Sequence, residues 1–287
     1  MPKMPKVGLL ISAKDTDKVW HPYIAAFQEA VTPGVTWDPQ PPSPGGAAGV
    51  GVNYDAAAAQ LVADQVDIIV TAGNLAAVAC TKASQKIPVV VAAAGDFTGL
   101  QGTNWTGCYN GQIVPPEILQ ARVALMNERL NPTAVGVVGN DAVPPVKTAM
   151  KNVVTLLGSL PIKKIDAFPL SLQQSDLQNV STIQAKLATL RNDVDVLYVC
   201  SDPLLRTHGD HVVTAAHGQH PWRNFKTMHE FGEWHTKHGG DLCYGPDFTQ
   251  LFVKAAEFVN QYLSTKTLPF PASPWMPGVQ DCMPTPP

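Results

Sequence analysis

The 287-residue chain has few charged residues and no surplus of basic ones. Charged residues make up 15% of the sequence, against about a quarter in an average globular protein, and the net charge is −3. Nucleic-acid binding depends on basic side chains that neutralise phosphates, so this composition predicts no nucleic-acid partner. The sequence also lacks an apolar run of the roughly 20 residues that a membrane-spanning helix needs.

Cysteines that could pair or bind zinc are lacking as well. The sequence has five cysteines and no Cys-x-x-Cys pair, and an odd number leaves at least one thiol unpaired. The five are Cys80, Cys108, Cys200, Cys243 and Cys282. This spacing indicates neither a disulfide framework nor a zinc site, and we interpret most of these residues as buried, inert thiols.

A secretion signal is not evident near the first residue. The apolar run covers only Val7 to Ser12 and ends before Lys14 and Asp15, whereas a signal peptide needs an apolar stretch of about 7–15 residues and a cleavage site. We therefore interpret this run as a first β-strand. We expect either a mature or trimmed chain that works in the periplasm, or a protein that stays in the cytoplasm.

Nucleotide-binding motifs are incomplete. The stretch from Gly49 to Tyr54 reads GVGVNY, which places tyrosine where the third glycine of a dinucleotide-binding motif belongs. A phosphate-binding loop of the GxxxxGK[ST] type does not occur in the sequence. We therefore expect no cofactor.

Short apolar runs alternate with segments of helical pattern along the whole chain. Runs such as VDIIV, IPVVV and VDVLYV are continuous and rich in β-branched residues, which is typical of parallel strands buried on both faces. The predicted strands are 7–12, 35–38, 66–71, 87–94, 134–139, 163–168, 194–200, 224–230 and 241–244, and the predicted helices are 56–63, 76–83, 115–129, 146–157, 175–190, 204–216 and 248–263. This alternation predicts an α/β fold.

The strand spacing repeats. Four predicted strands start at residues 7, 35, 66 and 87, and four more start at 134, 163, 194 and 224. We therefore predict two similar Rossmann-like lobes with a ligand cleft at the hinge. The expected division is residues 1–113 plus about 228–260 for the N-terminal lobe, and residues 114–227 plus about 261–287 for the C-terminal lobe.

Polar residues follow the predicted strand ends, where ligands bind in open α/β folds. Short polar side chains at such turns cap helices, and the free N–H groups of a helix N-terminus attract a carboxylate. An aspartate can bind an ammonium group, so Asn74 and Asp202 together suit an amino acid. The same residue types are also common in turns that bind nothing. The candidate ligand-binding residues are Ser12, Asn74, Asp96, Tyr109, Asn140, Asp141, Ser201, Asp202 and Glu230.

Aromatic and histidine residues add two weaker candidates. Six aromatic residues flank the polar turns, either as core residues or as a stacking surface for an aromatic ligand: Trp20, Trp105, Tyr109, Phe231, Trp234 and Tyr244. Seven of the eight histidines lie between residues 208 and 238, and three pairs are spaced by three. Such pairs share a helix face, but no HExxH motif or fixed tetrahedral set occurs, so we predict no metal site.

Several segments resemble a known family. The stretch GGDLCYGPDFTQLFVKAAEFVN (239–260) is similar to a segment near the end of ABC-transporter substrate-binding proteins of an uncharacterised type, whose relatives bind aromatic amino acids. The stretches 66–96, 104–107 (NWTG) and 193–205 (DVDVLYVCSDPLL) resemble other family segments in the same order, so the resemblance spans roughly residues 66–264. It implies a fold like that of type I periplasmic binding proteins, and ligand contacts near Asn74, Asp96, Asp141, Asp202 and Glu230. The chain departs from the family at Asn74, where threonine or serine is usual, and after Leu263.

These observations lead to a first hypothesis and two alternatives. The first is a solute-binding protein without enzymatic activity, which captures a small carboxylate-bearing ligand such as an amino acid or aromatic acid. If secreted, it would deliver this ligand to an ABC permease in the membrane. One alternative is an isomerase like the aspartate/glutamate racemases, which use one cysteine from each of two α/β halves. Cys200 lies at such a turn, but the matching turn at 72–74 has no thiol. The other alternative is a cytoplasmic ligand sensor.

Overall fold

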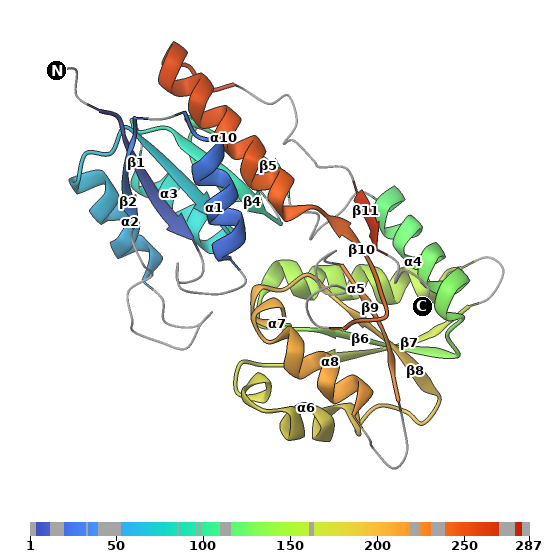
Figure 1. Cartoon of the computed structure of the whole chain (residues 1–287). Helices are drawn as coiled ribbons and strands as arrows, with labels where there is room; N and C mark the ends of the chain where they lie inside the picture. Colours follow the sequence, from blue (N-terminus) through green and yellow to red (C-terminus); the bar gives the residue numbers. More distant parts are fainter. Residues whose placement is uncertain are drawn as a thin grey trace. The chain divides into compact units, whose positions relative to one another are not determined.

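The computed structural model describes residues 4–11, 20–32, 34–39, 53–84, 86–95, 97, 99–109, 116–160, 164–218, 224–230, 239–269 and 279–282. The chain divides into two compact units, each built around its own sheet (Figure 1). The first lobe contains Met1–Asn110 and Asp247–Gly278, and the second contains Gly111–Pro246 and Val279–Pro287. Two parallel α/β lobes confirm the fold class predicted from the sequence.

The first lobe has a five-stranded parallel sheet in the order β2-β1-β3-β4-β5. Its strands are β1 (Lys6–Ile11), β2 (Thr36–Pro39), β3 (Ile68–Ala72), β4 (Val89–Ala94) and β5 (Trp105–Tyr109), and its helices are α1 (His21–Ala30), α2 (Tyr54–Ala63), α3 (Asn74–Ala83) and α10 (Phe248–Thr265). Every residue of β3 and β4 is buried, as expected of continuous apolar strands inside a sheet that is covered on both faces.

Helices cover the two faces of the first sheet. In Figure 1, α10 lies beside α1 although more than 200 residues separate them in the sequence. Asn260 of α10 joins the two helices, because its Nδ2 donates to the carbonyl of Ala30 (2.9 Å) and its Oδ1 accepts from the N–H of Thr32 (2.7 Å). On the other face, α2 and α3 pack with β1, β3 and β4 around a core that includes Leu61, Ala76 and Val91.

The second lobe has a six-stranded sheet in the order β11-β10-β9-β8-β6-β7, in which only β11 is antiparallel to its neighbour among the described pairs. The strands are β6 (Ala134–Gly139), β7 (Asp166–Ser171), β8 (Val194–Val199), β9 (Lys226–His229), β10 (Leu242–Pro246) and β11 (Val279–Cys282). The helices are α4 (Pro116–Leu130), α5 (Pro144–Gly158), α6 (Val180–Leu187), α7 (Pro203–Thr207) and α8 (Gly209–His217), with a short 3₁₀ turn η1 (Asp176–Gln178).

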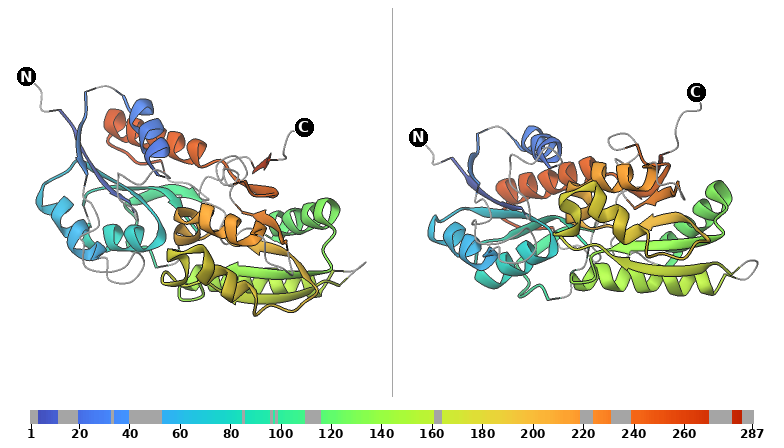
Figure 2. Two further views of the ribbon diagram at one scale, coloured as in Figure 1. Left: turned by 60° about the horizontal axis from the view of Figure 1, so that its bottom comes forward. Right: turned by 90° about the horizontal axis from the view of Figure 1, so that it is seen from below.

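The strand positions in the second sheet follow from composition. β6 is buried along its whole length and lies inside the sheet, whereas β7 contains Pro169 and forms an edge. Proline cannot donate to a neighbouring strand, so an edge is where it fits. Figure 2 shows α5 on one face of this sheet, and α6 and α8 on the other.

The return of the chain to the first lobe differs from the expected division. The sequence predicts that about 228–260 belong to the N-terminal lobe, but β9 pairs with β8 and β10 pairs with β9, so the second sheet continues to Pro246. The first lobe regains the chain at Asp247 and keeps it to Gly278, which includes most of the tail that was expected in the second lobe. The first crossing, expected at 113, lies after Asn110.

Several element boundaries were wrong for local reasons. Asn179 has extended backbone and caps α6 by accepting from the N–H of Thr182 (2.8 Å), so the single helix predicted for 175–190 is split. The helix predicted for 56–63 begins at Tyr54, because Asn53 caps it by accepting from the N–H of Ala56 (2.9 Å). The prediction missed α1, β5 and β11 because their sequences lack a clear periodic pattern.

Candidate functional site

The first-lobe candidates lie at the carboxyl edge of its sheet. The turn from β3 into α3 uses Gly73, whose φ of 91° favours glycine and whose N–H donates to the carbonyl of Ala93 on β4 (2.7 Å). Gly73 is the N-cap of α3, and no side chain there accepts from the first turn. The N-terminal N–H groups of this helix therefore lack the usual side-chain cap.

Short polar residues at these turns were expected to cap helices. Asn74 does not cap α3 but is its first residue. Its Oδ1 accepts from the N–H of Gly95 (2.9 Å), which ties the end of β4 to the start of the helix. Its neighbour Leu75 is 55% exposed, one of the two large apolar side chains most open to solvent in the described part of the chain. Ser12 and Asp96, also candidates, lie outside the described residues.

The aromatic candidates of the first lobe divide into core and surface. Trp20 is buried and packs edge-on against Tyr23 and Phe248, which is a core position. Tyr109 ends β5 at the carboxyl edge and is half-buried against Phe97, with 6.2 Å between ring centroids. Phe97 also stacks on Trp105 at 5.3 Å. Phe231 and Trp234 lie outside the described residues.

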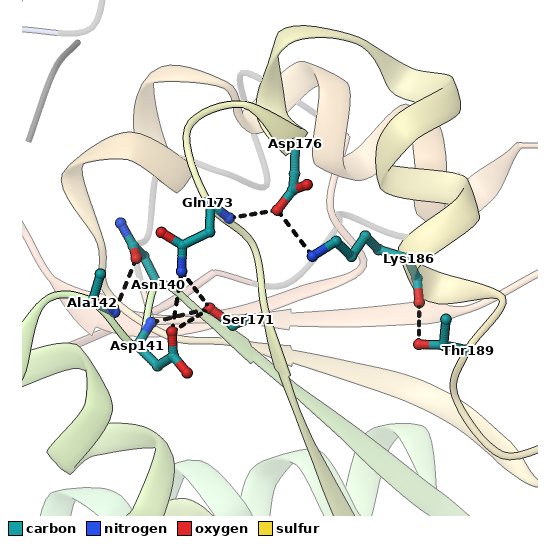
Figure 3. Close-up of polar contacts among 8 residues, drawn as sticks. All are labelled: Asn140, Asp141, Ala142, Ser171, Gln173, Asp176, Lys186 and Thr189. Carbon is teal, nitrogen blue, oxygen red and sulfur yellow. Dashed lines mark hydrogen bonds and ion pairs between the residues drawn. The ribbon is translucent and has the colours of Figure 1, made fainter.

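In the second lobe, Asn140 and Asp141 follow β6 and face the end of β7. The register pairs Gly139 with Ser171, so the two strand ends meet. Figure 3 shows the resulting cluster. The hydroxyl of Ser171 donates to Asp141 Oδ1 (2.6 Å), and Gln173 Nε2 donates to the same oxygen (3.1 Å) and to Ser171 Oγ (3.0 Å).

The loop that carries Gln173 is held by a buried aspartate. Asp176 Oδ2 accepts from the N–H of Gln173 (2.8 Å) and lies 3.3 Å from Lys186 Nζ of α6 (Figure 3). Ser171 and Gln173 were missed in the sequence because β7 was predicted to end at 168, three residues before its end in the structure. Had the end of β7 been predicted at Ser171, both residues would have been candidates, because candidates were chosen at and just after strand ends.

Asp202 follows β8, the strand next to β6. Its Oδ1 accepts from the N–H groups of Leu204 (2.7 Å) and Leu205 (3.0 Å), so it caps α7 as expected. Its Oδ2 is buried and has no hydrogen-bond partner among the described residues. Burial raises the pKa of this carboxyl to about 6, although the two N–H groups act to lower it.

Glu230 lies at the end of β9, but its carboxylate is used within the protein. Its Oε1 accepts from the hydroxyl of Tyr198 (2.7 Å) and lies 3.2 Å from Arg122 Nη1, and its Oε2 accepts from the N–H of Ser201 (2.6 Å). Arg122 of α4 also donates from Nε to the carbonyl of Tyr244 (2.9 Å). All these side chains are buried. Glu230 therefore positions the turn that holds Ser201 and Asp202.

Cys200, the residue of the isomerase alternative, is fully buried beside this network. Burial raises the pKa of its thiol well above the ordinary value, and the nearby Glu230 carboxylate acts in the same direction. Cys80 is also buried, and burial raises its pKa to about 12. A two-base mechanism needs thiolates near neutral pH, so neither environment supports racemase chemistry.

The geometry thus gives two sheets whose carboxyl edges each carry polar turns. A model of the family described as ABC transporter substrate binding protein matches residues 53–267. The chain belongs to this family. No curated protein sequence matches it.

Solved structures share the fold of this substrate-binding family member at low identity. A crystal structure of an ABC domain in complex with L-Trp from Streptococcus pneumoniae is 17% identical, with a TM-score of 0.75 over 96% of this chain and 89% of the other. A solute-binding protein from Bacillus halodurans with bound myo-inositol is 12% identical, with a TM-score of 0.70 over 99% and 96%. An arabinose-binding protein from Geobacillus stearothermophilus is 12% identical, with a TM-score of 0.67 over 98% and 97%.

The described part of this family member contains neither a cluster of metal-binding side chains nor a membrane-spanning helix. No three His, Cys, Asp or Glu side chains among the described residues are grouped so that they could hold a metal ion. His211 Nδ1 lies 2.8 Å from the carbonyl of Leu177, and His217 Nε2 lies 2.8 Å from Asp241 Oδ2. In the same described part, no helix combines the length and apolar character needed to cross a membrane.

Proposed function

We propose that this member of the substrate-binding family captures a small organic ligand that carries a carboxylate and an ammonium group, as an amino acid does. The observation that supports it most is Asp202 Oδ2, a buried oxygen without a hydrogen-bond partner among the described residues. A buried polar atom without a partner is costly, and an ammonium group would supply the missing hydrogen bond and a compensating charge.

For the ligand carboxylate we propose the first turn of α3. No side chain caps this turn, and uncapped N–H groups at a helix N-terminus attract anions. Asn74 and Tyr109 lie at the same carboxyl edge of the first sheet, after β3 and at the end of β5. Of the similar solved structures, one holds L-Trp and another holds myo-inositol, so proteins of this fold accept both ligand types.

The proposed role is binding without chemistry, followed by delivery to an ABC permease. Such delivery requires the protein to work outside the cytoplasmic membrane, so a periplasmic location is part of the proposal. The ligand cleft at the hinge remains a prediction from the sequence.

A thermal-shift screen tests the proposal. Protein that has been unfolded and refolded to remove bound ligand is screened against amino acids, aromatic acids, dicarboxylates and polyols. A ligand at about 100 times its Kd stabilises the folded state by roughly 2.7 kcal/mol, which is a clear rise in Tm. We expect amino acids to raise Tm, and we expect D202N to abolish this rise. The exposed-site variant D166N is the control and should respond like the wild type.

Two results would contradict the proposal. One is a screen in which no compound raises Tm. The other is an amino-acid hit that D202N binds as tightly as the wild type does. The pH dependence gives a further check, because protonation removes the charge of Asp202 below a pH of about 6. Affinity for an ammonium-bearing ligand should therefore weaken as the pH falls through that value.

A further inference from the structure

The Asp141 cluster contains a set of hydrogen bonds that can be counted group by group. Ser171 uses its single O–H on Asp141 Oδ1, and its oxygen accepts from Gln173 Nε2 and from the N–H of Asp141 (3.3 Å). Gln173 Nε2 has two N–H groups, and these donate to Asp141 Oδ1 and Ser171 Oγ. The donors of both side chains are therefore used inside the cluster.

Two acceptor oxygens of the cluster are not used. Asp141 Oδ2 and Gln173 Oε1 have no hydrogen-bond partner among the described residues, and Asp141 is exposed. Capping does not explain Asp141, because Val143 is the N-cap of α5 and no side chain caps that helix. The cluster thus fixes the orientation of a carboxylate and leaves one of its oxygens open to solvent.

Asn140 supplies a complementary group beside these oxygens. It is only 4% exposed, and its Oδ1 accepts from the N–H of Ala142 (3.1 Å). Its Nδ2 has no partner among the described residues, and Figure 3 shows it directed away from Ala142. Asn140 Nδ2 is not among the buried side-chain atoms that lack a partner, so it reaches solvent at this edge and is open to an acceptor group of a ligand.

We propose that Asp141, Gln173 and Asn140 form a ligand subsite at the ends of β6 and β7, which takes a hydrogen-bond donor of the ligand on Asp141 and Gln173 and an acceptor on Asn140. This inference rests on the proposed function and adds Gln173 as a specificity-determining residue. The donor is either the ammonium group of an amino acid, whose three N–H groups allow it to contact Asp141 and Asp202 on the neighbouring strand ends together, or a hydroxyl group. Binding of a polyol in place of an amino acid would support the subsite and contradict the ligand of the proposed function. A bare carboxylate faces two acceptors here and is disfavoured.

The hydrogen bonds around the subsite make it rigid before ligand arrives. Asp176 and Lys186 hold the backbone of Gln173, and Ser171 holds Asp141, so little conformational freedom is lost on binding. A rigid acceptor pair discriminates well, because a ligand without a donor leaves both oxygens unpaired.

Calorimetric titration of refolded protein tests the subsite with five proteins: wild type, D141N, Q173L, D202N and the control D166N. Asp166 is the matched control because it is an exposed aspartate at the opposite end of β7. The probes are L-phenylalanine, its analogue 3-phenylpropionate, which lacks the ammonium group, and ribitol; any further hit of the thermal-shift screen is titrated alongside. In D141N an N–H₂ group replaces the open oxygen. The donor group of the ligand then faces a donor group of the protein, and the hydrogen bond between them is lost.

We expect D141N to weaken binding of the probe by about 10- to 100-fold, since a hydrogen bond to a charged group contributes roughly that factor. D166N should stay within about twofold, which is the scatter expected of a surface change. The probes that bind, and the effect of salt on their binding, distinguish an ammonium donor from a hydroxyl donor. An ammonium donor predicts that L-phenylalanine binds, that 3-phenylpropionate does not, and that added NaCl weakens binding. A hydroxyl donor predicts that ribitol binds with little salt dependence.

The outcomes distinguish this inference from the function on which it rests. If D141N and Q173L bind within twofold of the wild type while D202N loses binding, the subsite is wrong and the proposed function stands. If 3-phenylpropionate binds as tightly as L-phenylalanine and ribitol does not bind, the donor requirement is wrong. If no compound binds the wild type, the proposed function and the subsite both fail.

Discussion

At the scale of single residues, Asp202 shows how a binding group can cost stability. Its carboxyl caps α7 through one oxygen, while the other oxygen is buried without a partner among the described residues. Burial disfavours the charged form, which is why the pKa is raised from 3.8 to about 6. A group of this kind fits a protein that gains stability when its ligand binds.

The sign of the pH dependence follows from the direction of this shift. Between pH 3.8 and about 6 the folded state holds more protons at Asp202 than the unfolded state, so rising pH lowers the free energy of unfolding. D202N does not ionise there. We expect the free energy of unfolding of D202N, relative to the wild type, to increase by roughly 2–3 kcal/mol from pH 4 to pH 8. Urea unfolding of ligand-free protein at both pH values measures this, and a constant difference would contradict it.

At the scale of elements, one buried ion pair joins α4 to the carboxyl ends of β8 and β9. Arg122 and Glu230 are both about 1% exposed, and Tyr198 and the N–H of Ser201 complete the hydrogen bonds of the carboxylate. Removing one partner of a buried pair leaves an uncompensated charge in a region of low polarity. This network therefore holds the turn of Ser201 and Asp202 in place.

We expect R122M to lower the free energy of unfolding by about 3–5 kcal/mol, because it leaves the Glu230 carboxylate buried without its cation. The double variant R122M/E230Q should recover part of that loss, since no buried charge then remains. R129M is the control, because Arg129 is exposed and its pair with Glu128 contributes no more than about 1 kcal/mol. Denaturant unfolding measures all three. Additive effects of R122M and E230Q would show that the two residues are not coupled.

The same scale shows which elements could be predicted. The strands at 68–72, 89–94, 134–139 and 194–199 were predicted because each is a continuous apolar run buried on both faces. The edge strand β7 was placed three residues early, since it contains Pro169 and only Leu170 of its six residues is buried. That error concealed Ser171 and Gln173, whereas Asn140, Asp141 and Asp202 became candidates because they follow buried strands.

At the scale of the whole molecule, each lobe is a separate layered unit that completes its own core. The first lobe depends on α10, whose apolar face packs against α1, β4 and β5 although it follows the second lobe in the sequence. Phe252 of α10 is fully buried and packs against Trp20 and Tyr23. Truncation of the Phe252 side chain should therefore destabilise the first lobe.

We expect F252A to destabilise the first lobe by about 3–5 kcal/mol, the usual cost of truncating a buried phenylalanine. Hydrogen exchange read by mass spectrometry should show faster exchange in α1, β4 and β5, because α10 packs against these elements. Peptides from β6 and β8 in the second lobe serve as the internal control and should keep their protection. Equal loss of protection in both lobes would show that the protein unfolds as one cooperative unit.

The sequence by itself determined the fold class and most turn positions, because buried parallel strands and the polar residues after them leave a local pattern. Tertiary structure alone decided the lobe to which α10, β9 and β10 belong, since pairing partners distant in sequence leave no such pattern. It also decided the roles of two acids that look alike in sequence. Glu230 is neutralised by Arg122 from a distant helix, whereas Asp202 keeps an oxygen without a partner among the described residues.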